Sequence, residues 1–523
     1  MDWFPKRTIG DVLRVTVDQY GDRSALIYGA RSWTWAEFVE EVDRLAVGLM
    51  GIGVEAGDHV GLWMTNRPEW LFAMFAIPRI GAVSVPLNTR YRVDDASYAI
   101  DQSDITTLLA IDRSGPIDYL AMLTEMRPAL PKLRRVAMLG DTSSNHLSWD
   151  TMLAAGASVS PAELEARASS VDPDLPMLIV YTSGTTSAPK GAVHSHAWLR
   201  RVAERAQLLG LRHDDVHLSY LPLFHAYGYS EIAATCAVTG ACQVLMDIFE
   251  AEEALDLAER HHATIVHGFD THYQDLVRAQ RAAPRALDLR LGTLPAGMES
   301  TRAIAHEVQE VLCPTVSGWG MSEVWAFAAM SHPSDTVEQR CEASGYPMLD
   351  SEFRLVDLET GGPIKAGEPG ELLVRTYSTM LGYYNKPDAT RATIDPDGWV
   401  HTGDLVTIRP DGHLRLIGRC KDMLKVGGEN VAPAEIEDRL LDLPAIDEIA
   451  VIGTPDERLG EVAAAFVTLH PGTKLSLQDL VDHLEGRVAS FKVPRQLFVI
   501  DEMPMTASGK IRKADLRVRA RST

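Results

Sequence analysis

The sequence predicts an α/β protein that has a large N-terminal domain and a small C-terminal domain. Segments typical of helices alternate with segments typical of buried strands, which is the pattern of α/β proteins. After about residue 350 the chain changes to short strand-like segments, which Gly, Pro and Asp-Gly turns separate. We therefore expect an N-terminal domain over residues 1–420, with a β-rich subdomain from about 350 to 420, and a C-terminal domain over residues 421–523.

The clearest helix is expected over residues 34–50. Thr34 and Glu37 have the spacing of a capping box, and apolar residues then recur every three or four positions. The apolar stretch 70–87 is interrupted by Pro78 and Arg79, so it predicts a buried helix followed by a strand rather than a membrane span. Short apolar runs predict buried strands at 59–63, 82–87 and 264–269.

Turn signals organise the C-terminal third of the chain. Asp397-Gly398 and Asp411-Gly412 are typical of the turns of β-hairpins. Beyond Lys421, the stretch 475–489 predicts a helix, and strands are expected at 448–453 and 463–469. The C-terminal domain is therefore expected to contain both helices and strands.

The composition excludes several classes of function. The formal net charge of −22 repels phosphate backbones, so nucleic-acid binding is not expected. Five cysteines are scattered without a C-x-x-C pair, which argues against a disulfide framework and against a zinc ribbon. The N-terminus lacks the apolar core of a signal peptide, and we expect a cytoplasmic protein.

One loop has the composition of a phosphate-binding site. Residues 181–191 read YTSGTTSAPKG, directly after an apolar run. Glycines let backbone N–H groups converge on an anion, hydroxyls add neutral donors, and Lys190 adds a charge. The loop does not follow the G-x-x-x-x-G-K-[ST] order, so a P-loop NTPase is not expected. A solvated surface loop remains the alternative.

Four further motifs carry groups that suit a nucleotide. Trp319 in GWGMSE (318–323) is a platform for a purine, and Glu323 is a ligand for Mg²⁺. Asp404, in a glycine-rich turn, can accept hydrogen bonds from ribose hydroxyls. Arg419 precedes the Gly427-Gly428 pair, and Lys510 lies on a glycine-flanked loop near the C-terminus. Each motif alone is equally compatible with a core or surface role.

Taken together and in order, these motifs resemble the acyl-adenylate-forming superfamily, which includes acyl-CoA synthetases, adenylation domains of peptide synthetases and firefly luciferase. The resemblance extends from SWTWAEF near the start to SGKIRK near the end. It implies a multi-layer N-terminal domain and a mobile C-terminal lid that rotates about Lys421. It also implies a two-step reaction, in which ATP adenylates a carboxylic acid with release of pyrophosphate, and coenzyme A then accepts the acyl group with release of AMP.

The resemblance implies a role for each matching residue. Catalytic roles fall to Lys510, Glu323, Thr186 and His225, and Glu323 also holds Mg²⁺. ATP binding falls to Thr182, Ser183, Gly184, Thr185, Thr186, Lys190, Gly318, Trp319, Gly320, Met321, Ser322, Asp404, Arg419 and Lys510. The CoA tunnel comprises Lys425, Gly427, Gly428 and Glu429. The acyl pocket comprises His225, Tyr229, Phe269, Ala296, Gly297 and Met298.

The sequence departs from the family pattern near the acyl pocket. The segment 266–269 reads VHGF where a Val-Pro-Thr-like turn is common, and 295–298 reads PAGM. Ser187 stands where a glycine is usual. The aromatic residues of the pocket favour an apolar acid, which could be of medium chain, alicyclic or aromatic, and His267 or Asp270 could bind a polar substituent. The histidines of 261–273 lack a metal-binding spacing.

Three alternatives remain open at this point. The acyl acceptor could be a carrier protein instead of CoA. The chain could be a non-catalytic relative, although Lys510 and Glu323 are retained, or a luciferase-like oxygenase, for which the sequence shows no positive sign. A homodimer is also considered.

Overall fold

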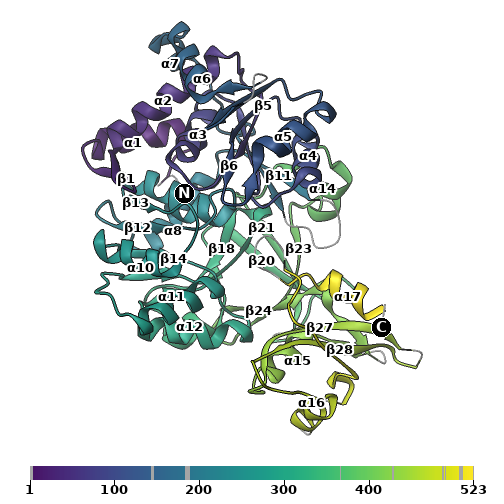
Figure 1. Ribbon diagram of the computed structural model, residues 1–523. Coiled ribbons are helices and arrows are strands. Elements are labelled where there is room, and N and C mark those ends of the chain that lie inside the picture. The colour runs from purple at the N-terminus through teal and green to yellow at the C-terminus, as the bar shows by residue number, and fades with distance from the viewer. Residues whose placement is uncertain are drawn as a thin grey trace.

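The computed structural model describes residues 4–142, 146–182, 189–365, 367–426, 429–456, 458–485, 488, 490–505 and 511–521. A large N-terminal domain is joined to a small C-terminal domain, which lies below it in Figure 1. The predicted fold class is therefore confirmed. No helix within the described ranges combines the length and the apolar character needed to cross a membrane.

The first large sheet of the N-terminal domain has seven strands in the order β16-β15-β14-β12-β13-β1-β2. From β16 to β1 all neighbours are parallel, so these strands end at a common edge. Helices α10 (Ala251–Arg260), α11 (Asp270–Ala282) and α12 (Glu299–Val311) make the crossovers that parallel strands require. The strands are β1 Ser24–Tyr28, β2 Arg31–Thr34, β12 Val216–Ser219, β13 Cys242–Leu245, β14 Ile265–His267, β15 Leu291–Thr293 and β16 Thr315–Val316.

The second sheet has eight strands in the order β22-β11-β10-β4-β3-β5-β8-β9, and only β11 and β22 run antiparallel to their neighbours. Its buried side chains join those of the first sheet in one continuous apolar core. The strands are β3 His59–Trp63, β4 Val83–Pro86, β5 Thr107–Ile111, β8 Arg135–Leu139, β9 Leu147–Ser148, β10 Leu178–Thr182, β11 Lys190–His194 and β22 Gly382–Tyr383. The helices of this half are α1 Ile9–Tyr20, α2 Trp35–Gly51, α3 Pro68–Arg79, α4 Val93–Gln102, α5 Tyr119–Met126, α6 Trp149–Ala155 and α7 Pro161–Ser169.

Several elements form where the sequence predicts them. Helix α2 begins after Thr34, and both hydrogen bonds of the Thr34–Glu37 capping box are present. Strand β3 has the predicted bounds, and the apolar stretch 70–87 forms α3 followed by β4. These elements are specified by local signals, namely a cap, a period and a proline, so sequence reasoning finds them.

The β-rich region is an antiparallel sheet of β20 (Ser351–Val356), β21 (Gly370–Thr376), β23 (Val400–Ile408) and β24 (Leu414–Arg419). A second small sheet contains β17 (Gly318–Met321), β18 (Ala326–Met330) and β19 (Tyr346–Pro347). The two sheets share an apolar cluster that includes Trp319 and Leu372. The turn of Asp411-Gly412 joins β23 to β24, as its hairpin signal predicts.

Two buried arginines of helix α8 (Trp198–Leu208) attach these small sheets to the main body of the domain. Arg201 is fully buried and donates to the hydroxyls of Ser351 and Thr376, each at 2.7 Å. Arg205 donates to the Phe327 carbonyl of β18 at 3.2 Å and pairs with the buried carboxylate of Glu231 at 2.9 Å. Because a buried charge is tolerated only when it is paired and hydrogen-bonded, these contacts fix the position of the sheets that carry the nucleotide-side motifs.

The C-terminal domain has an apolar cluster on each face of its sheet. Successive residues of β27 and β28 point to opposite faces, so Val451 and Ile452 belong to different clusters. Helix α16 ends at Leu484, shorter than the expected 475–489, because Glu485 leaves the helical conformation and a glycine follows it in the sequence. The elements are β25 Leu424–Val426, β26 Glu429–Val431, β27 Ile446–Asp456, β28 Gly460–Leu469, β29 Gln496–Val499, α15 Pro433–Leu440, α16 Leu477–Leu484 and α17 Lys513–Arg521.

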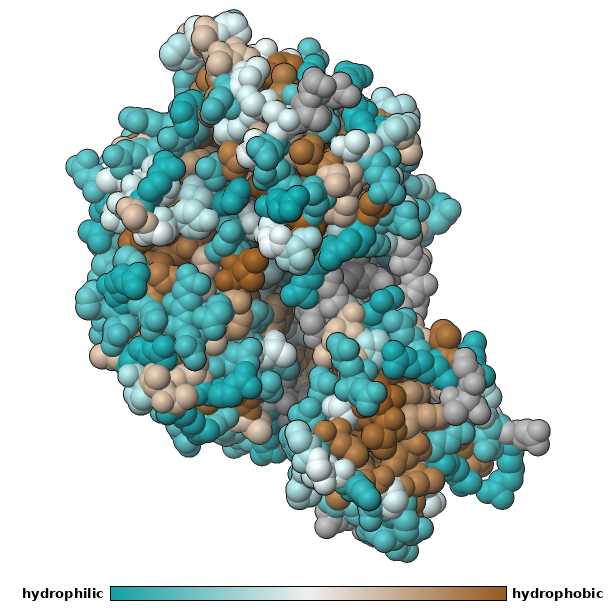
Figure 2. Space-filling view, viewed as in Figure 1, coloured by the Kyte–Doolittle hydropathy of each residue, from teal (hydrophilic) through white to brown (hydrophobic). Residues whose placement is uncertain are grey.

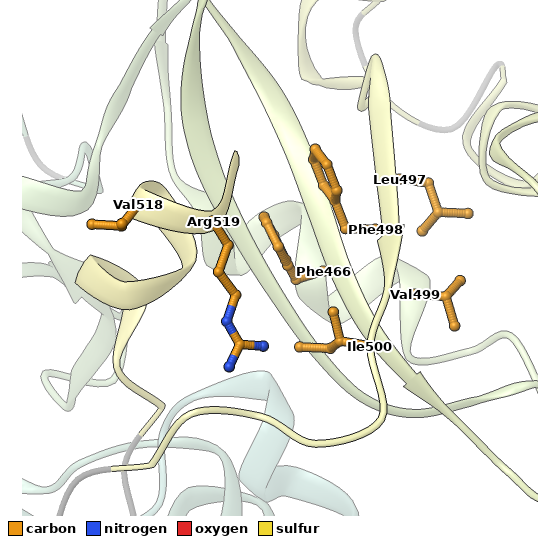
Figure 3. A pocket seen from close by; sticks show the side chains of 7 residues that line it. All are labelled: Phe466, Leu497, Phe498, Val499, Ile500, Val518 and Arg519. Carbon is orange, nitrogen blue, oxygen red and sulfur yellow. The ribbon is translucent and has the colours of Figure 1, made fainter. Parts of the chain in front are cut away.

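Part of one cluster reaches the surface of this domain. Figure 2 shows hydrophobic atoms gathered on the face of the C-terminal domain. In the cluster that contains Ile452, the buried Phe466 stacks on Phe498 of β29 with ring centroids 4.4 Å apart. Figure 3 shows the shallow groove between β29 and α17, lined by Phe466, Leu497, Phe498, Val499, Ile500, Val518 and Arg519.

Candidate active site

The predicted phosphate loop connects the paired strands β10 and β11. Thr182 and Lys190 are opposite each other in this antiparallel pair, and the hydroxyl of Thr182 donates to the Lys190 carbonyl at 3.3 Å. The pair therefore holds both ends of the loop. The remaining predicted residues, Ser183, Gly184, Thr185, Thr186 and Ser187, lie outside the described residues, so their placement stays a prediction.

The candidate metal ligand Glu323 lies on a tight turn after β17. Its side chain is buried, and its Oε1 accepts a hydrogen bond from the phenol of Tyr383 at 2.6 Å. After Val324, Trp325 and Ala326 have positive φ angles of 64° and 56°, which non-glycine residues adopt at an energetic cost. A Cβ at Gly320 would come within 1.5 Å of the Ala326 carbonyl oxygen, so glycine is required there.

Lys190 connects the phosphate loop to this turn. Its ammonium lies over the ring of Tyr383, 4.3 Å from the ring centroid, in cation–π geometry. Burial, together with the neighbouring Glu323 carboxylate, raises the pKa of the Tyr383 phenol, so the hydroxyl stays protonated and donates. Among the described residues, no hydrogen-bond donor is present at the other oxygen of Glu323, Oε2.

Asp404 and its partners form the candidate ribose site on β23. Asp404 is buried, and each of its oxygens has a donor. Trp319 Nε1 donates to Oδ2, and Arg419 Nε pairs with Oδ1, both at 2.9 Å. Strand register explains the second contact, since Asp404 and Arg419 are opposite each other on β23 and β24. The Trp319 ring is only 4% exposed, so stacking on adenine stays a prediction that needs a more open ring face.

Three predicted acyl-pocket segments follow successive strands of the seven-stranded sheet. His225 follows β12, Phe269 follows β14, and the turn 296–298 follows β15. The carboxyl ends of parallel strands form the usual ligand-binding edge of an open α/β sheet. The imidazole of His225 meets the ring of Phe269 edge-on at 6.1 Å, and Tyr227 contacts the same ring at 5.0 Å.

The turn at 296–298 is held rigidly. Ala296 N donates to Ser317 Oγ at 2.9 Å, and the Ala296 carbonyl accepts from Ser344 Oγ at the same distance. Gly297 has φ +118°, and a Cβ there would come within 2.2 Å of Ser344 Oγ. Met298 then precedes helix α12. The PAGM sequence therefore forms a fixed wall rather than a loose loop.

Tyr229 lies in a separate aromatic cluster. It belongs to a π-helix, Gly228–Ala234, and its ring contacts Trp70, Trp198 and Trp325. The ring is 1% exposed, and its hydroxyl has no hydrogen-bond partner among the described residues. Its assignment to the acyl pocket therefore stays a prediction.

His267 is fully engaged inside the sheet. Its Nδ1 lies 2.8 Å from Thr293 Oγ1, and its Nε2 lies 3.3 Å from His217 Nδ1. Burial lowers the pKa of His217 to about 4 and that of His267 well below its usual value, so both rings are neutral at pH 7. Asp270, at the start of α11, is partly exposed. Of the two residues considered for a polar substituent, Asp270 is the more accessible.

The predicted residues of the C-terminal domain are only partly described. Lys421 lies in a short 3₁₀ turn between β24 and β25, which belong to different sheets. Burial is the main cause that lowers its pKa. The backbones of Lys425 and Glu429 lie on the paired strands β25 and β26. Gly427, Gly428 and Lys510 lie outside the described residues.

Sequence reasoning missed two features of the site. One is Tyr383, whose only signal is the GYYN segment at 382–385, distant in sequence from Glu323. The other is the buried pair of Arg205 and Glu231 behind the turn that carries Glu323. In the described part of the chain, no group of three or more His, Cys, Asp or Glu residues is arranged to hold a metal ion.

Comparison with known proteins identifies the family. A model described as AMP-binding enzyme matches residues 13–384, and its C-terminal domain model matches residues 435–510. The chain is 35% identical, over 98% of both chains, to 3-[(3aS,4S,7aS)-7a-methyl-1,5-dioxo-octahydro-1H-inden-4-yl]propanoyl:CoA ligase of Mycobacterium tuberculosis. It is 30% identical to the human mitochondrial medium-chain acyl-CoA ligase ACSF2, over 98% of this chain and 87% of that one.

A solved structure shows the same architecture. The anthranilate CoA ligase AuaEII in complex with anthranoyl-AMP superposes with a TM-score of 0.88 and 27% sequence identity, covering 100% of this chain and 98% of that one. The family models, the relatives and the fold agree over nearly the whole length. The chain therefore belongs to the AMP-binding enzyme family.

Proposed function

We propose that the protein converts a bulky, largely apolar carboxylic acid into its CoA thioester. The reaction class follows from the family: the protein is an ATP-dependent acyl-CoA synthetase, which adenylates the acid and then transfers the acyl group to coenzyme A. ATP, coenzyme A and Mg²⁺ take part in this reaction. The observation that carries our choice of acid is the arrangement of His225, Phe269 and the 296–298 turn at one sheet edge.

The adenylation step joins two anions, so positive charge must meet the α-phosphate as the transition state forms. We assign this role to Lys510, with the residues of the loop 182–190 holding the β- and γ-phosphates. Lys190 would contribute its charge from the end of that loop. Glu323 fits a metal ligand because its carboxylate is fixed through Oε1 while Oε2 has no donor among the described residues. When bound, Mg²⁺ would neutralise part of the phosphate charge.

The nucleoside would lie against the β-rich subdomain. Asp404 can accept from ribose hydroxyls, since a carboxylate is a hydrogen-bond acceptor that can take more than one donor on each oxygen. Gly318, Gly320, Met321 and Ser322 form the strand and turn beside it. The extended backbone of β17 would then flank the base, as the motif predicts.

The thioester step requires a second arrangement of the C-terminal domain. We propose that Lys421 is the hinge, because it occupies the short turn between the four-stranded sheet of the β-rich region and the sheet of the C-terminal domain. Rotation there would withdraw Lys510 and bring Lys425, Gly427, Gly428 and Glu429 to the site. Glycine has no side chain, so the Gly427-Gly428 pair in the sequence would leave room for the pantetheine arm. His225 would lie where the arm meets the acyl carbonyl.

The acid is proposed to be of medium chain or to carry a ring. Phe269, Tyr227 and Met298 offer an apolar surface, and the rigid 296–298 turn limits the depth of the pocket. The names of the relatives support this range, which includes an alicyclic propanoate and a medium-chain acid. The partly exposed Asp270 would favour a substituent that donates a hydrogen bond.

Pyrophosphate release across a panel of carboxylic acids, with and without CoA, tests this proposal. Medium-chain, alicyclic and aromatic acids should give the highest kcat/KM. If acetate proved as good a substrate as any larger acid, the proposed acyl pocket would be wrong.

The acyl acceptor and the hinge need separate tests. We propose free CoA as the acceptor, and a parallel assay with an acyl carrier protein would separate the two. Lys510→Ala should nearly abolish adenylation and leave preformed acyl-adenylate able to react with CoA. Equal loss in both steps would contradict the two arrangements of the lid.

We also propose a cytoplasmic location and include a homodimer among the possible assemblies. All five cysteines are free, which suits a reducing compartment. Sedimentation at two protein concentrations would determine the oligomeric state.

A further inference from the structure

The segment 378–384 connects the phosphate-loop strand to the turn that carries Glu323. On one side, Met380 N donates to the Glu323 carbonyl at 2.7 Å, and Ser378 Oγ donates to the Val324 carbonyl at 2.9 Å. On the other side, backbone bonds join the segment to strand β11, with Leu381 N donating to Val193 O and Tyr384 N donating to Gly191 O, both at 2.8 Å. Lys190 begins the same strand β11.

Tyr383 lies at the centre of this connection. Its backbone pairs with Ala192 of β11, and its ring is 6% exposed. The phenol donates to Glu323 Oε1 at 2.6 Å, while the Lys190 ammonium lies over the ring face. One side chain therefore contacts both the end of the phosphate loop and the carboxylate assigned to the metal.

We propose that Tyr383 is a positioning residue that directs Glu323 towards the metal ion on the phosphates of ATP and couples that carboxylate to Lys190. The proposal rests on the proposed role of Glu323 in ATP binding. A free glutamate side chain samples several rotamers, and a short hydrogen bond to one oxygen selects a single orientation. With Oε1 occupied, Oε2 is the oxygen that faces a ligand.

The phenol suits this task because it can only donate here. A phenol is neutral at pH 7, and its hydroxyl meets a carboxylate oxygen that can only accept. A positive donor in its place would neutralise Glu323 and weaken the attraction of that carboxylate for a cation. Lys190 is held over the ring, 4.3 Å from its centroid, and Tyr383 rather than Lys190 donates to Oε1.

The test separates metal binding from phosphate binding. Calorimetry would give the Kd of ATP with chelator and with saturating Mg²⁺ for the wild type, Tyr383→Phe, Tyr383→Leu and Tyr384→Phe. The ratio of the two Kd values measures how much the metal contributes. Tyr384→Phe is the matched control, because its neighbouring phenol donates to Asp104 Oδ2 at 2.9 Å and not to Glu323.

We expect Tyr383→Phe to lower the metal-dependent ratio about tenfold, equivalent to about 1.4 kcal/mol, and to leave the affinity for metal-free ATP unchanged. Tyr383→Leu should lower both, because it also removes the ring beneath Lys190. Tyr384→Phe should change neither. An unchanged ratio in Tyr383→Phe would overturn the proposal, as would a wild-type protein whose affinity for ATP does not depend on Mg²⁺.

A structural role alone would produce a different result. It would lower the unfolding temperature of Tyr383→Phe and reduce both affinities together, which would also overturn the proposal. The binding measurement needs no acid. If ATP binds with the expected metal dependence and no acid in the panel is activated, the proposed substrate class fails while the role of Tyr383 stands.

Discussion

Two buried carboxylates of the site, Glu323 and Asp404, are held in different ways. Asp404 has a donor on each oxygen, one from an indole and one from a guanidinium. Glu323 has one donor among the described residues, the neutral phenol of Tyr383. Asp404 is thus part of a charge-compensated contact, whereas Glu323 has no cationic partner among the described residues, as its proposed role as a metal ligand requires.

Because of this difference, we expect variants of Asp404 to lower the stability of the fold, and variants of Glu323 to lower the rate of adenylation without destabilising the fold. Removing the charge of Asp404 disturbs partners that depend on it, so folding and nucleotide affinity should suffer together. Removing the charge of Glu323 disturbs no cation among the described residues, so the fold should tolerate the change while adenylation fails. Variants that change one of these contacts at a time test whether the two carboxylates differ in this way.

The largest effect is expected from Glu323→Gln. The amide oxygen can still accept from Tyr383, but the charge offered to Mg²⁺ is lost. We expect ATP–pyrophosphate exchange to fall on the order of 10²–10³-fold, with little change in the unfolding temperature. The exposed Glu352→Gln, which pairs only with Arg375 among the described residues, is the control. A large drop in stability without loss of exchange would show that Glu323, like Asp404, has a structural role.

The next effect concerns His194, which supports the Glu323 turn. Its Nε2 lies 2.7 Å from the Ser322 carbonyl oxygen, so this nitrogen carries the proton and donates. Burial lowers the pKa of His194 to about 4. Below its usual value of 6.5 the unfolded chain binds a proton that the folded protein does not accept until about pH 4.

Stability is therefore expected to fall as the pH drops through this window, with His194 contributing up to about 3 kcal/mol at the low end. Urea unfolding at a series of pH values measures the slope. His194→Gln keeps an N–H donor. It should reduce the slope of the unfolding free energy against pH by up to the contribution of one bound proton. Equal slopes for the wild type and His194→Gln would contradict the prediction.

Asp404→Asn should have a smaller effect, spread over two properties. The amide can accept from Trp319 or from Arg419 but presents a donor to the other. We expect the unfolding free energy to fall by about 1–2 kcal/mol, because the half-exposed Arg419 can turn to water. The KM for ATP should rise about tenfold. The exposed Asp397→Asn is the control, and an unchanged unfolding free energy would show that Asp404 is not a structural contact.

These residues also show where sequence reasoning succeeds. The motifs of Glu323, Asp404, Arg419 and Lys190 are identified by residue type and order, and the structure brings Asp404 to Arg419 through strand register. Helix α2 is specified by Thr34 and Glu37 within one turn. In each case the signal lies in a few neighbouring residues or in a matching family pattern.

The contacts that orient these residues could not be predicted in this way. Tyr383 is 60 residues from Glu323 and reaches it only because β22 adds to the edge of β11. The buried pair of Arg205 and Glu231 looks like ordinary surface charge in the sequence. Tyr229 lies next to a recognisable motif, yet the π-helix directs its ring into a tryptophan cluster. Long-range packing decides these positions, and local patterns do not encode it.

The smallest effect, from Trp319→Phe, is the sharpest test of the comparison. The substitution keeps an aromatic ring in the apolar cluster, but removes part of the buried indole together with the N–H that reaches Asp404 Oδ2. Arg419 still pairs with the other oxygen, so we expect the KM for ATP to rise only twofold to fivefold, or about 0.5–1 kcal/mol, with kcat unchanged. Like Tyr383→Phe, this variant removes one donor from one buried carboxylate. Because Asp404 retains a charged partner, the rise in the KM for ATP of Trp319→Phe should not depend on the Mg²⁺ concentration. A Mg²⁺-dependent defect in Trp319→Phe would show that the two carboxylates act as one unit, and the distinction between them would fail.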